Sequence, residues 1–286
     1  MASVKDLRDR IKSLKNTQQI TKAMKQVAAA KIRRAELAQR QARPYADALF
    51  AMLRDLMNAV GAVDHPFLKP GREGAPRGIV LMTSDKGLAG AFNSNVTRLG
   101  EQIARKDPNL VWYSVGNKAR NATKRMSQQT VFDVPLSAGP KIETARRIAA
   151  RVTDDFTAGT ISEIVLVSSK LVSMSNQRPE SRTLVPIVAE KSDASAEGPR
   201  GAVEFAPSPE AVLTRLLPKY LEFTIFSAML ETDAAFFAAQ LIAMNNATDN
   251  AGKLIDELTL QMNKARQTAI TSEMLEIVGG AEAIVG

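Results

Sequence analysis

The residues whose types and spacing could support chemistry lie first of all in the segment TSDKGLAGAFNSN (83–95), between an apolar run and a helix-forming stretch. A loop in this position binds dinucleotide phosphates in many α/β proteins. However, Gly87 and Gly90 lack the G-x-G-x-x-G spacing, and Lys86 precedes its glycine, whereas the lysine of a Walker A motif follows one. We therefore predict a structural turn here in preference to a phosphate-binding loop.

Few other residues could serve in catalysis. Asp85 and Lys86 could act as a pair, but no His, Cys or second carboxylate gathers near them, so a pair that stabilises the turn is the better interpretation. His65, the single histidine, stands between Asp64 and Pro66, which indicates a solvated surface side chain. The chain has no cysteine and therefore no disulfide, thiol nucleophile or thiolate metal site. We expect no catalytic site, no metal and no cofactor.

The positive charge of the chain is concentrated at its N-terminal end. Residues 1–58 contain 13 Lys and Arg against 5 Asp and Glu, which accounts for the whole formal net charge of +8. Such a surface could be an ordinary solvated helix face, or it could attract acidic partners, nucleic acid included. Because no aromatic residue precedes Tyr45 and no nucleic-acid-reading module is recognisable, a nucleic-acid partner is not expected.

The N-terminal end is predicted to be one long helix. All 13 prolines lie between Pro44 and Pro218. Residues 2–58 are rich in helix formers, contain no glycine, and have only Pro44, which should kink the helix without ending it. Its apolar seam is predicted to shift register midway, as in a coiled coil with a stutter. The predicted seam positions are Val4, Leu7, Ile11, Leu14, Ile20, Met24, Val27, Leu49, Leu53 and Leu56.

The C-terminal end is predicted to be a second long helix. It opens with Ser208, Pro209 and Glu210, which are typical of a cap, a first-turn proline and an acidic residue at the positive end of the helix dipole. Alternate steps of three and four from Leu216 to Ala269 give seam positions that are apolar except for two hydroxyl residues. A strict heptad pattern of this length indicates a partner helix along the whole seam. The seam comprises Leu216, Tyr220, Phe223, Ser227, Leu230, Ala234, Phe237, Leu241, Met244, Thr248, Ala251, Ile255, Leu258, Met262, Ala265 and Ala269.

Between the helices the pattern changes to that of an α/β domain. β-rich runs at 78–82, 110–115, 130–134, 163–169 and 183–188 alternate with helical stretches near 94–107, 117–127 and 142–158. The alternation predicts an open, largely parallel, Rossmann-like sheet with helices on its faces, and 191–201 should be an exposed loop. The predicted fold class is α+β mixed. Its predicted parts are an antiparallel coiled coil of residues 1–58 and 208–286 and an inserted sheet domain of residues 76–207.

The two long helices should lie side by side, because both leave the α/β domain at nearly the same place. Equal distances along them put Met24 near Met244 and the N-terminus near residue 265. Beyond the seam the heptad pattern ends, but the C-terminal end of the helix remains rich in apolar side chains. Such side chains are rarely left exposed to water. We expect a partner to surround this tip. Its apolar residues are Ile270, Met274, Leu275, Ile277, Val278, Ile284 and Val285.

A membrane-spanning helix is not expected. No run approaches the roughly 18 consecutive apolar residues that a transmembrane helix needs. Any link to a membrane should therefore come through a partner.

Two segments resemble the gamma subunit of F-type ATP synthase: ITKAMKQVAAAKIRRA (20–35) and AMNNATDNAGKLIDELTLQMNKARQTAITSEMLEIVGGA (243–281). RPYA (43–46), the TSDKGL loop (83–88) and the total length also fit. The resemblance implies that the terminal helices form a central shaft inside a ring of alternating alpha and beta subunits. It also implies that the α/β domain is a foot on the membrane c-ring, beside the epsilon subunit. Such a subunit has no catalytic site and couples ion flow to conformational cycling of the beta sites.

The resemblance also places partner contacts on particular residues. Met24 and Lys25 match the place where the shaft meets beta-subunit loops. Gln240 and Met244 belong to the paired shaft, and Gln240 stands where the family usually has an arginine, so the cation of a salt bridge centred there is missing. Four residues match the family's contact with the beta catch loop: Arg266, Gln267, Thr271 and Glu273.

Two other classes of protein compete with this interpretation. One is a nucleotide-binding α/β enzyme with helical arms, which should bind NAD or ATP as an isolated chain. The other is a coiled-coil nucleic-acid binder, whose affinity should fall steeply with salt. The resemblance favours a peripheral location at the cytoplasmic face of a bacterial inner membrane over a processed mitochondrial form.

Overall fold

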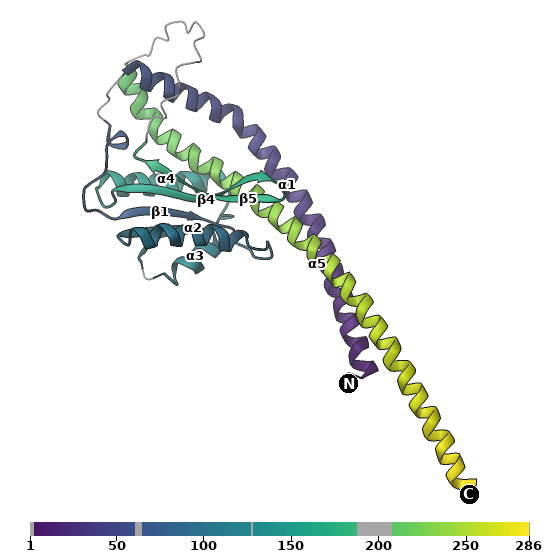
Figure 1. Cartoon of the computed structure of the whole chain (residues 1–286). Coiled ribbons are helices and arrows are strands. Elements are labelled where there is room, and N and C mark those ends of the chain that lie inside the picture. Colours follow the sequence, from purple (N-terminus) through teal and green to yellow (C-terminus); the bar gives the residue numbers. More distant parts are fainter. Residues whose placement is uncertain (1–2, 61–64, 127, 188–207, 286) are drawn as a thin grey trace. The chain divides into compact units, whose positions relative to one another are not determined.

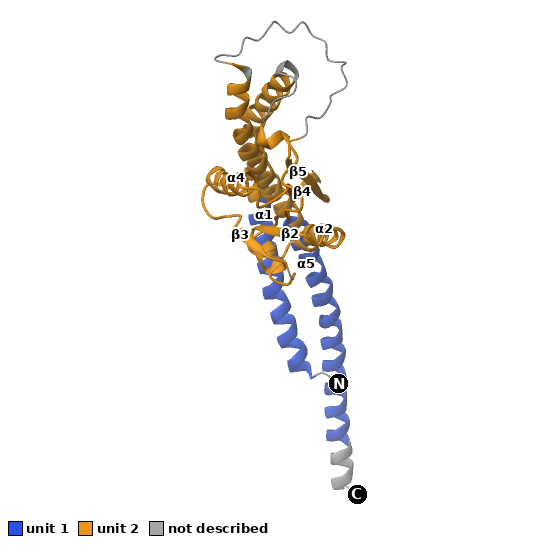
Figure 2. Cartoon of the chain, turned by 90° about the vertical axis from the view of Figure 1, so that its left-hand side faces the viewer, with its two compact units in different colours: residues 1–29, 240–286 blue, residues 30–239 orange. Residues whose placement is uncertain are grey.

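A computed structural model describes residues 3–60, 65–126, 128–187 and 208–285 (Figure 1). The chain divides into two compact units, one of residues 1–29 with 240–286 and one of residues 30–239 (Figure 2). Both long helices run through this division, so each unit contains a part of each helix. We call the first the helix-pair unit and the second the sheet unit.

The two terminal helices form as predicted. Helix α1 runs from Val4 to Val60 and helix α5 from Pro209 to Val285. Pro44 lies inside α1 without ending it. The hydroxyl of Ser208 accepts a hydrogen bond from the backbone N–H of Ala211 at 3.2 Å, which confirms the predicted helix start.

The helix-pair unit is an antiparallel pair. The Thr21 and Thr248 hydroxyls lie 2.8 Å apart, and the Lys25 ammonium donates to Oδ1 of Asn245 at 2.5 Å. The amide of Gln18 donates to the carbonyl of Thr248 at 3.4 Å. Residue numbers therefore rise along α1 as they fall along α5, in the register that the sequence predicts.

The predicted stutter in the α1 seam is wrong. Ile20 and Val27 are 60% and 54% exposed, whereas Thr21 and Ala28 are 8% and 0% exposed. Seven-residue steps from the buried Leu7 reach Thr21 and Ala28 without a register shift. The same steps go on to the buried Leu49 and Leu56, so one unbroken heptad runs through α1. Small and polar residues occupy the middle of the seam.

The described residues of the sheet unit form five strands in the order β3-β2-β1-β4-β5. Strands β1 to β4 are mutually parallel and β5 is antiparallel to β4, so the prediction of an open, largely parallel sheet is confirmed. The strands are β1 (Arg77–Met82), β2 (Leu110–Val115), β3 (Thr130–Val134), β4 (Glu163–Ser173) and β5 (Asn176–Val185). The helices between them are α2 (Phe92–Lys106), α3 (Asn117–Thr123) and α4 (Lys141–Thr157), and a short 3-10 turn, η1, covers Pro66–Leu68.

Each face of the sheet is covered by its own helices. Alternate residues of one strand point to opposite faces, as Tyr113 and Trp112 of β2 do. On the Tyr113 face lie α4 and the parts of α1 and α5 that belong to the sheet unit, with fully buried residues such as Ile148 and Leu217. On the Trp112 face lie α2 and α3.

The fifth strand is longer and earlier than predicted. Strands β4 and β5 form a hairpin around Met174 and Ser175, and β5 ends at Val185. The predicted strand 183–188 is therefore confirmed at 183–185 and wrong at 186–187, and residue 188 lies outside the described residues. The hairpin tip is exposed and the first eight residues of β5 are mostly polar, so this strand has no apolar run except at its end. Helix α3 is also shorter than predicted. The expected loop at 191–201 lies outside the described residues.

The parts of α1 and α5 in the sheet unit are paired through aromatic rings. Phe50 packs edge-on against Tyr220 with 5.2 Å between ring centres, and Tyr45 lies 4.8 Å from Phe223. Aromatic pairs of this geometry add to the burial of apolar area. In this unit α1 and α5 therefore pair through large aromatic side chains, whereas the middle of the seam in the helix-pair unit holds small and polar residues.

Candidate partner-binding surfaces

The residues predicted for the middle of the shaft lie close together in the helix-pair unit. Met244 is 5% exposed and Met24 is half-buried at the edge of the seam. Lys25 is exposed, but its ammonium donates to Asn245. An ammonium group has three donors, so Lys25 keeps two for a partner's carboxylate. Gln240 is 8% exposed, and it lies in the buried part of the helix pair.

A second feature of this region escaped the sequence analysis, which put Ile20 and Val27 in the seam. Together with Met24 they are spaced by four and three residues, so they share one side of α1. Their exposure makes this side an apolar surface open to a partner. Counting the seam in sevens from Leu7 would have revealed it, because that register leaves both residues outside.

The predicted C-terminal contact residues lie on a bare stretch of helix. Every residue from Arg266 to Val278 is exposed, including the four predicted contacts. The hydroxyl of Thr271 donates to the backbone carbonyl of Gln267 at 2.9 Å, whereas Arg266 and Glu273 form no ion pair within the described residues. These residues begin 22 positions beyond Met244, which is about 33 Å along a helix. The two predicted contact sets are therefore separate surfaces.

The tip of α5 exposes large apolar side chains. Within the described residues, Leu275 and Ile277 are 68% and 71% exposed, and Met274 and Val278 are exposed as well. The predicted pairing ends where the exposure begins, near residue 265. Such a surface is typical of a binding interface.

In the described residues the TSDKGL loop has a structural role, and the Asp85 carboxylate holds it in place through hydrogen bonds. Its carboxylate accepts hydrogen bonds from the backbone N–H groups of Asn117, Leu136 and Ser137 and from the Ser137 hydroxyl, at 2.6–3.0 Å. Burial alone would raise the pKa of Asp85, but these four bonds outweigh it and hold the pKa below its ordinary value. A low pKa and saturated oxygens suit a structural anchor, as the sequence indicates.

Side-chain hydrogen bonds to one backbone carbonyl stabilise the rest of the loop, which also contains one residue with a strained backbone. The hydroxyl of Ser84 and the amide of Asn93 both donate to the backbone carbonyl of Lys86. Leu88 adopts a left-handed backbone, φ 61°, and is 64% exposed. Ala89 is buried against α5 residues of the same unit. Lys86 therefore stabilises the turn through its carbonyl and makes no ion pair with Asp85 in the described residues.

His65 is not the solvated residue that the sequence indicates. It caps η1, because its Nδ1 accepts a hydrogen bond from the backbone N–H of Phe67 at 3.1 Å. Its ring also packs edge-on against the Phe67 ring. Partial burial lowers the pKa of His65. The prediction failed because the fold buries Phe67, and the His65 ring two residues away packs against it.

The described residues contain no cluster of three or more His, Asp or Glu side chains arranged to hold a metal ion. Helix α5 is apolar and long enough, by composition alone, to cross a bilayer between Glu210 and Val278. However, 56% of its most apolar window is buried inside the protein, as in the core helix of a folded domain. Length and composition are therefore weak grounds for a membrane span.

The fold and these surfaces define a class of protein: two long terminal helices, paired antiparallel, flank a mixed sheet, and their faces are exposed for partners. The family model described as ATP synthase matches residues 3–284. The chain is 45% identical over 285 residues to an ATP synthase gamma chain of Desulforamulus reducens, covering 99% of this chain and 100% of the relative. It is 43% identical over 292 residues to that of Heliobacterium modesticaldum, with the same coverage.

The chain therefore belongs to the family of ATP synthase gamma chains. The fold agrees. A chain of the mitochondrial ATP synthase of Euglena gracilis superposes with a TM-score of 0.68 at 18% identity, covering 98% of this chain and 94% of that one. A chain of the central stalk and c-ring structure from Tetrahymena thermophila superposes with a TM-score of 0.61 at 20% identity, covering 80% and 99%.

Proposed function

We propose that this chain is the central-stalk gamma subunit of an F-type ATP synthase. The paired helices act as a rotor shaft inside a ring of alpha and beta subunits, and the sheet unit binds the epsilon subunit and the membrane c-ring. The subunit does no catalysis itself. It couples ion flow through the membrane sector to the conformational cycle of the beta sites, as a peripheral component at the cytoplasmic face of a bacterial inner membrane.

One observation carries the shaft proposal. Residues 266–278 of α5 are exposed and have no partner helix among the described residues, and they include Met274, Leu275 and Ile277. A single helix with large apolar side chains in water is costly at roughly 25 cal/mol per Å² of apolar surface. A surrounding sleeve of subunits removes that cost.

The charge of α1 supports the same proposal. The first 58 residues hold the entire excess of +8. Long-range attraction to acidic loops depends weakly on the angle between the partners, so it can persist while a shaft turns. By contrast, specific contacts such as those proposed for Met24, Lys25 and Arg266 must break in every rotation and should each be weak.

A crosslink can test the shaft role directly. The chain has no cysteine, so Met24→Cys introduces a single thiol. In the assembled complex, with a second cysteine in the facing beta loop, oxidation should stop multi-turnover ATP hydrolysis, and reduction should restore it. Full hydrolysis in the crosslinked complex would disprove the rotor role.

A control separates rotation from damage by the thiol. Met24→Cys without the second cysteine, oxidised in the same way, should still hydrolyse ATP over many turnovers. Gentle purification should also recover the chain with alpha, beta and epsilon subunits. Recovery of the folded chain without alpha and beta subunits would count against the assignment.

A further inference from the structure

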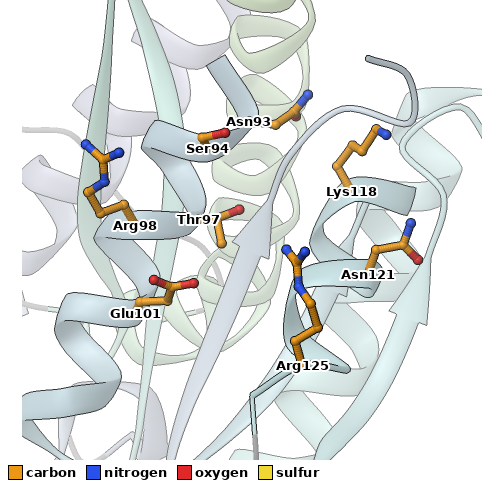
Figure 3. Close-up of a pocket in the computed structure, with 8 residues that line it drawn as sticks. All are labelled: Asn93, Ser94, Thr97, Arg98, Glu101, Lys118, Asn121 and Arg125. Carbon is orange, nitrogen blue, oxygen red and sulfur yellow. The ribbon is translucent and has the colours of Figure 1, made fainter. Parts of the chain in front are cut away.

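An open groove lies between α2 and α3 on the Trp112 face of the sheet unit (Figure 3). Its volume is about 470 Å³, and every residue that lines it has a polar or charged side chain. We call it the α2–α3 groove. Its lining residues are Asn93, Ser94, Thr97, Arg98, Glu101, Lys118, Asn121 and Arg125.

The two walls of the groove run in the same direction. Helices α2 and α3 follow the parallel strands β1 and β2, so both begin at the same edge of the sheet. Asn93 and Lys118 therefore lie at one end of the groove, and Glu101 and Arg125 at the other, as Figure 3 shows. From residue 93 to residue 101 the α2 wall extends for about 12 Å.

The charges in the groove are unbalanced. It has three cationic side chains, Arg98, Lys118 and Arg125, against one carboxylate, Glu101. None of the four forms an ion pair or hydrogen bond through its charged group within the described residues. This contrasts with cations nearby, such as Arg77, which binds Glu163 at 2.8 Å. The groove therefore presents unpaired positive charge beside amides and hydroxyls.

Three backbone N–H groups at the starts of α2 and α3 are already bonded within the protein. Phosphate sites at helix starts use free backbone N–H groups. Here the N–H of Phe92 donates to Ala89, that of Asn117 to the Asp85 carboxylate, and that of Lys118 to the carbonyl of Ser84. The charged donors of the groove belong to side chains spread along two walls. Such donors suit carboxylates distributed along a chain.

We propose that the α2–α3 groove binds an extended, acidic peptide segment of a partner protein. A wall of about 12 Å matches roughly four residues of extended chain at about 3.3 Å each. Arg98, Lys118 and Arg125 pair with its carboxylates, while Asn121 binds its backbone groups. Glu101 repels an acidic residue at its own end and so orients the segment. The proposal does not depend on the rotor assignment.

Fluorescence anisotropy with a labelled peptide of six glutamates, added to the full chain, tests the proposal. Lys118→Glu combined with Arg125→Glu should weaken binding about tenfold or more, because two attractions become repulsions. Glu101→Gln should strengthen it. The matched control, Arg105→Glu with Lys124→Glu, changes the same charge on exposed residues outside the groove and should leave the affinity within about twofold.

Three outcomes would overturn the proposal. Equal losses in the groove variant and the control would indicate diffuse attraction, for instance to the basic α1. Unchanged binding in the groove variant would place the peptide elsewhere. Inorganic phosphate that displaces the peptide as effectively as free hexaglutamate would indicate a small-anion site. Unchanged fluorescence of Trp112, the single tryptophan, would verify that each variant remains folded.

Discussion

The helix-pair unit and the sheet unit are stabilised in different ways. In the sheet unit, large side chains such as Trp112, Ile148 and Leu217 are fully buried between layers. In the helix-pair unit, burial is confined to one seam, whose middle holds Thr21 and Ala28. One chain thus combines a layered core, which buries large side chains, with a pair of helices that is buried along a single seam only.

The difference has a physical meaning for function. A layered core buries much apolar area and fixes its side chains by close packing. A two-helix seam buries little, and its small or hydroxyl side chains let the helices approach without locking large side chains together. The helix pair is thus left with most of its surface for partners. Four experiments test how far the contrast holds.

The largest effect is expected in the sheet unit. Leu217→Ala removes a fully buried side chain and should lower the free energy of unfolding by about 2–5 kcal/mol. Trp112 fluorescence in a urea titration reports this unit alone. Leu260→Ala, at a 72% exposed position of α5, is the control and should change little. If Leu217→Ala and Leu260→Ala lowered the free energy of unfolding equally, the contrast between the buried core and the exposed helix would be wrong.

Asp85 should show the next largest effect. Asp85→Asn loses a charged acceptor and turns an NH₂ group toward backbone donors, at a cost of about 2–3 kcal/mol. Since the folded pKa lies below the ordinary 3.8, the stabilisation is present above pH 3.8 and is lost as pH falls through the folded pKa.

Urea titrations of Asp85→Asn and the original chain at several pH values measure this. The difference in unfolding free energy should hold from pH 7 down to about 3.8 and shrink only below it. Asp154→Asn, on the exposed side of α4, should be nearly neutral throughout. A difference that shrinks already at pH 6 would show that Asp85 is not the anchor.

The corrected seam should show a moderate effect. Ala28→Leu forces a large side chain into a fully buried position and should destabilise the helix pair by about 1–3 kcal/mol, seen as earlier loss of helical circular dichroism on heating. Val27→Leu, at the exposed neighbour, should be almost silent. If Val27→Leu destabilised the helix pair more than Ala28→Leu, Val27 would be the buried residue and the predicted stutter would be correct.

The smallest effect on stability belongs to the tip. Deletion of residues 273–286 should change the unfolding free energy by less than about 0.5 kcal/mol, because the described side chains removed are exposed. Urea titration of the isolated chain measures it. Assembly with alpha and beta subunits, followed by size exclusion, should by contrast be weakened. A tip that stabilises the free chain would contradict its role as a binding surface.

Much of the architecture could be predicted from local patterns. The absence of breakers and the heptads of α5 predict both long helices and their antiparallel register, which the Lys25–Asn245 contact confirms. The parallel strands follow from short apolar runs. The β4–β5 hairpin does not, because its polar residues gain their strand conformation from pairing with each other and carry little propensity of their own.

What the sequence by itself determined was the set of elements, the charge on α1 and the family. Apolar character and an unbroken count in sevens from Leu7 mark different sides of α1. Only the tertiary structure decided between them, because the close approach of α5 selects small residues such as Ala28. It also decided that His65 caps a turn and that unpaired cations of α2 and α3 face one groove. The buried side of α1 and the groove are relations between segments distant in the chain. The His65 cap is local, but it depends on the burial of Phe67 by such segments.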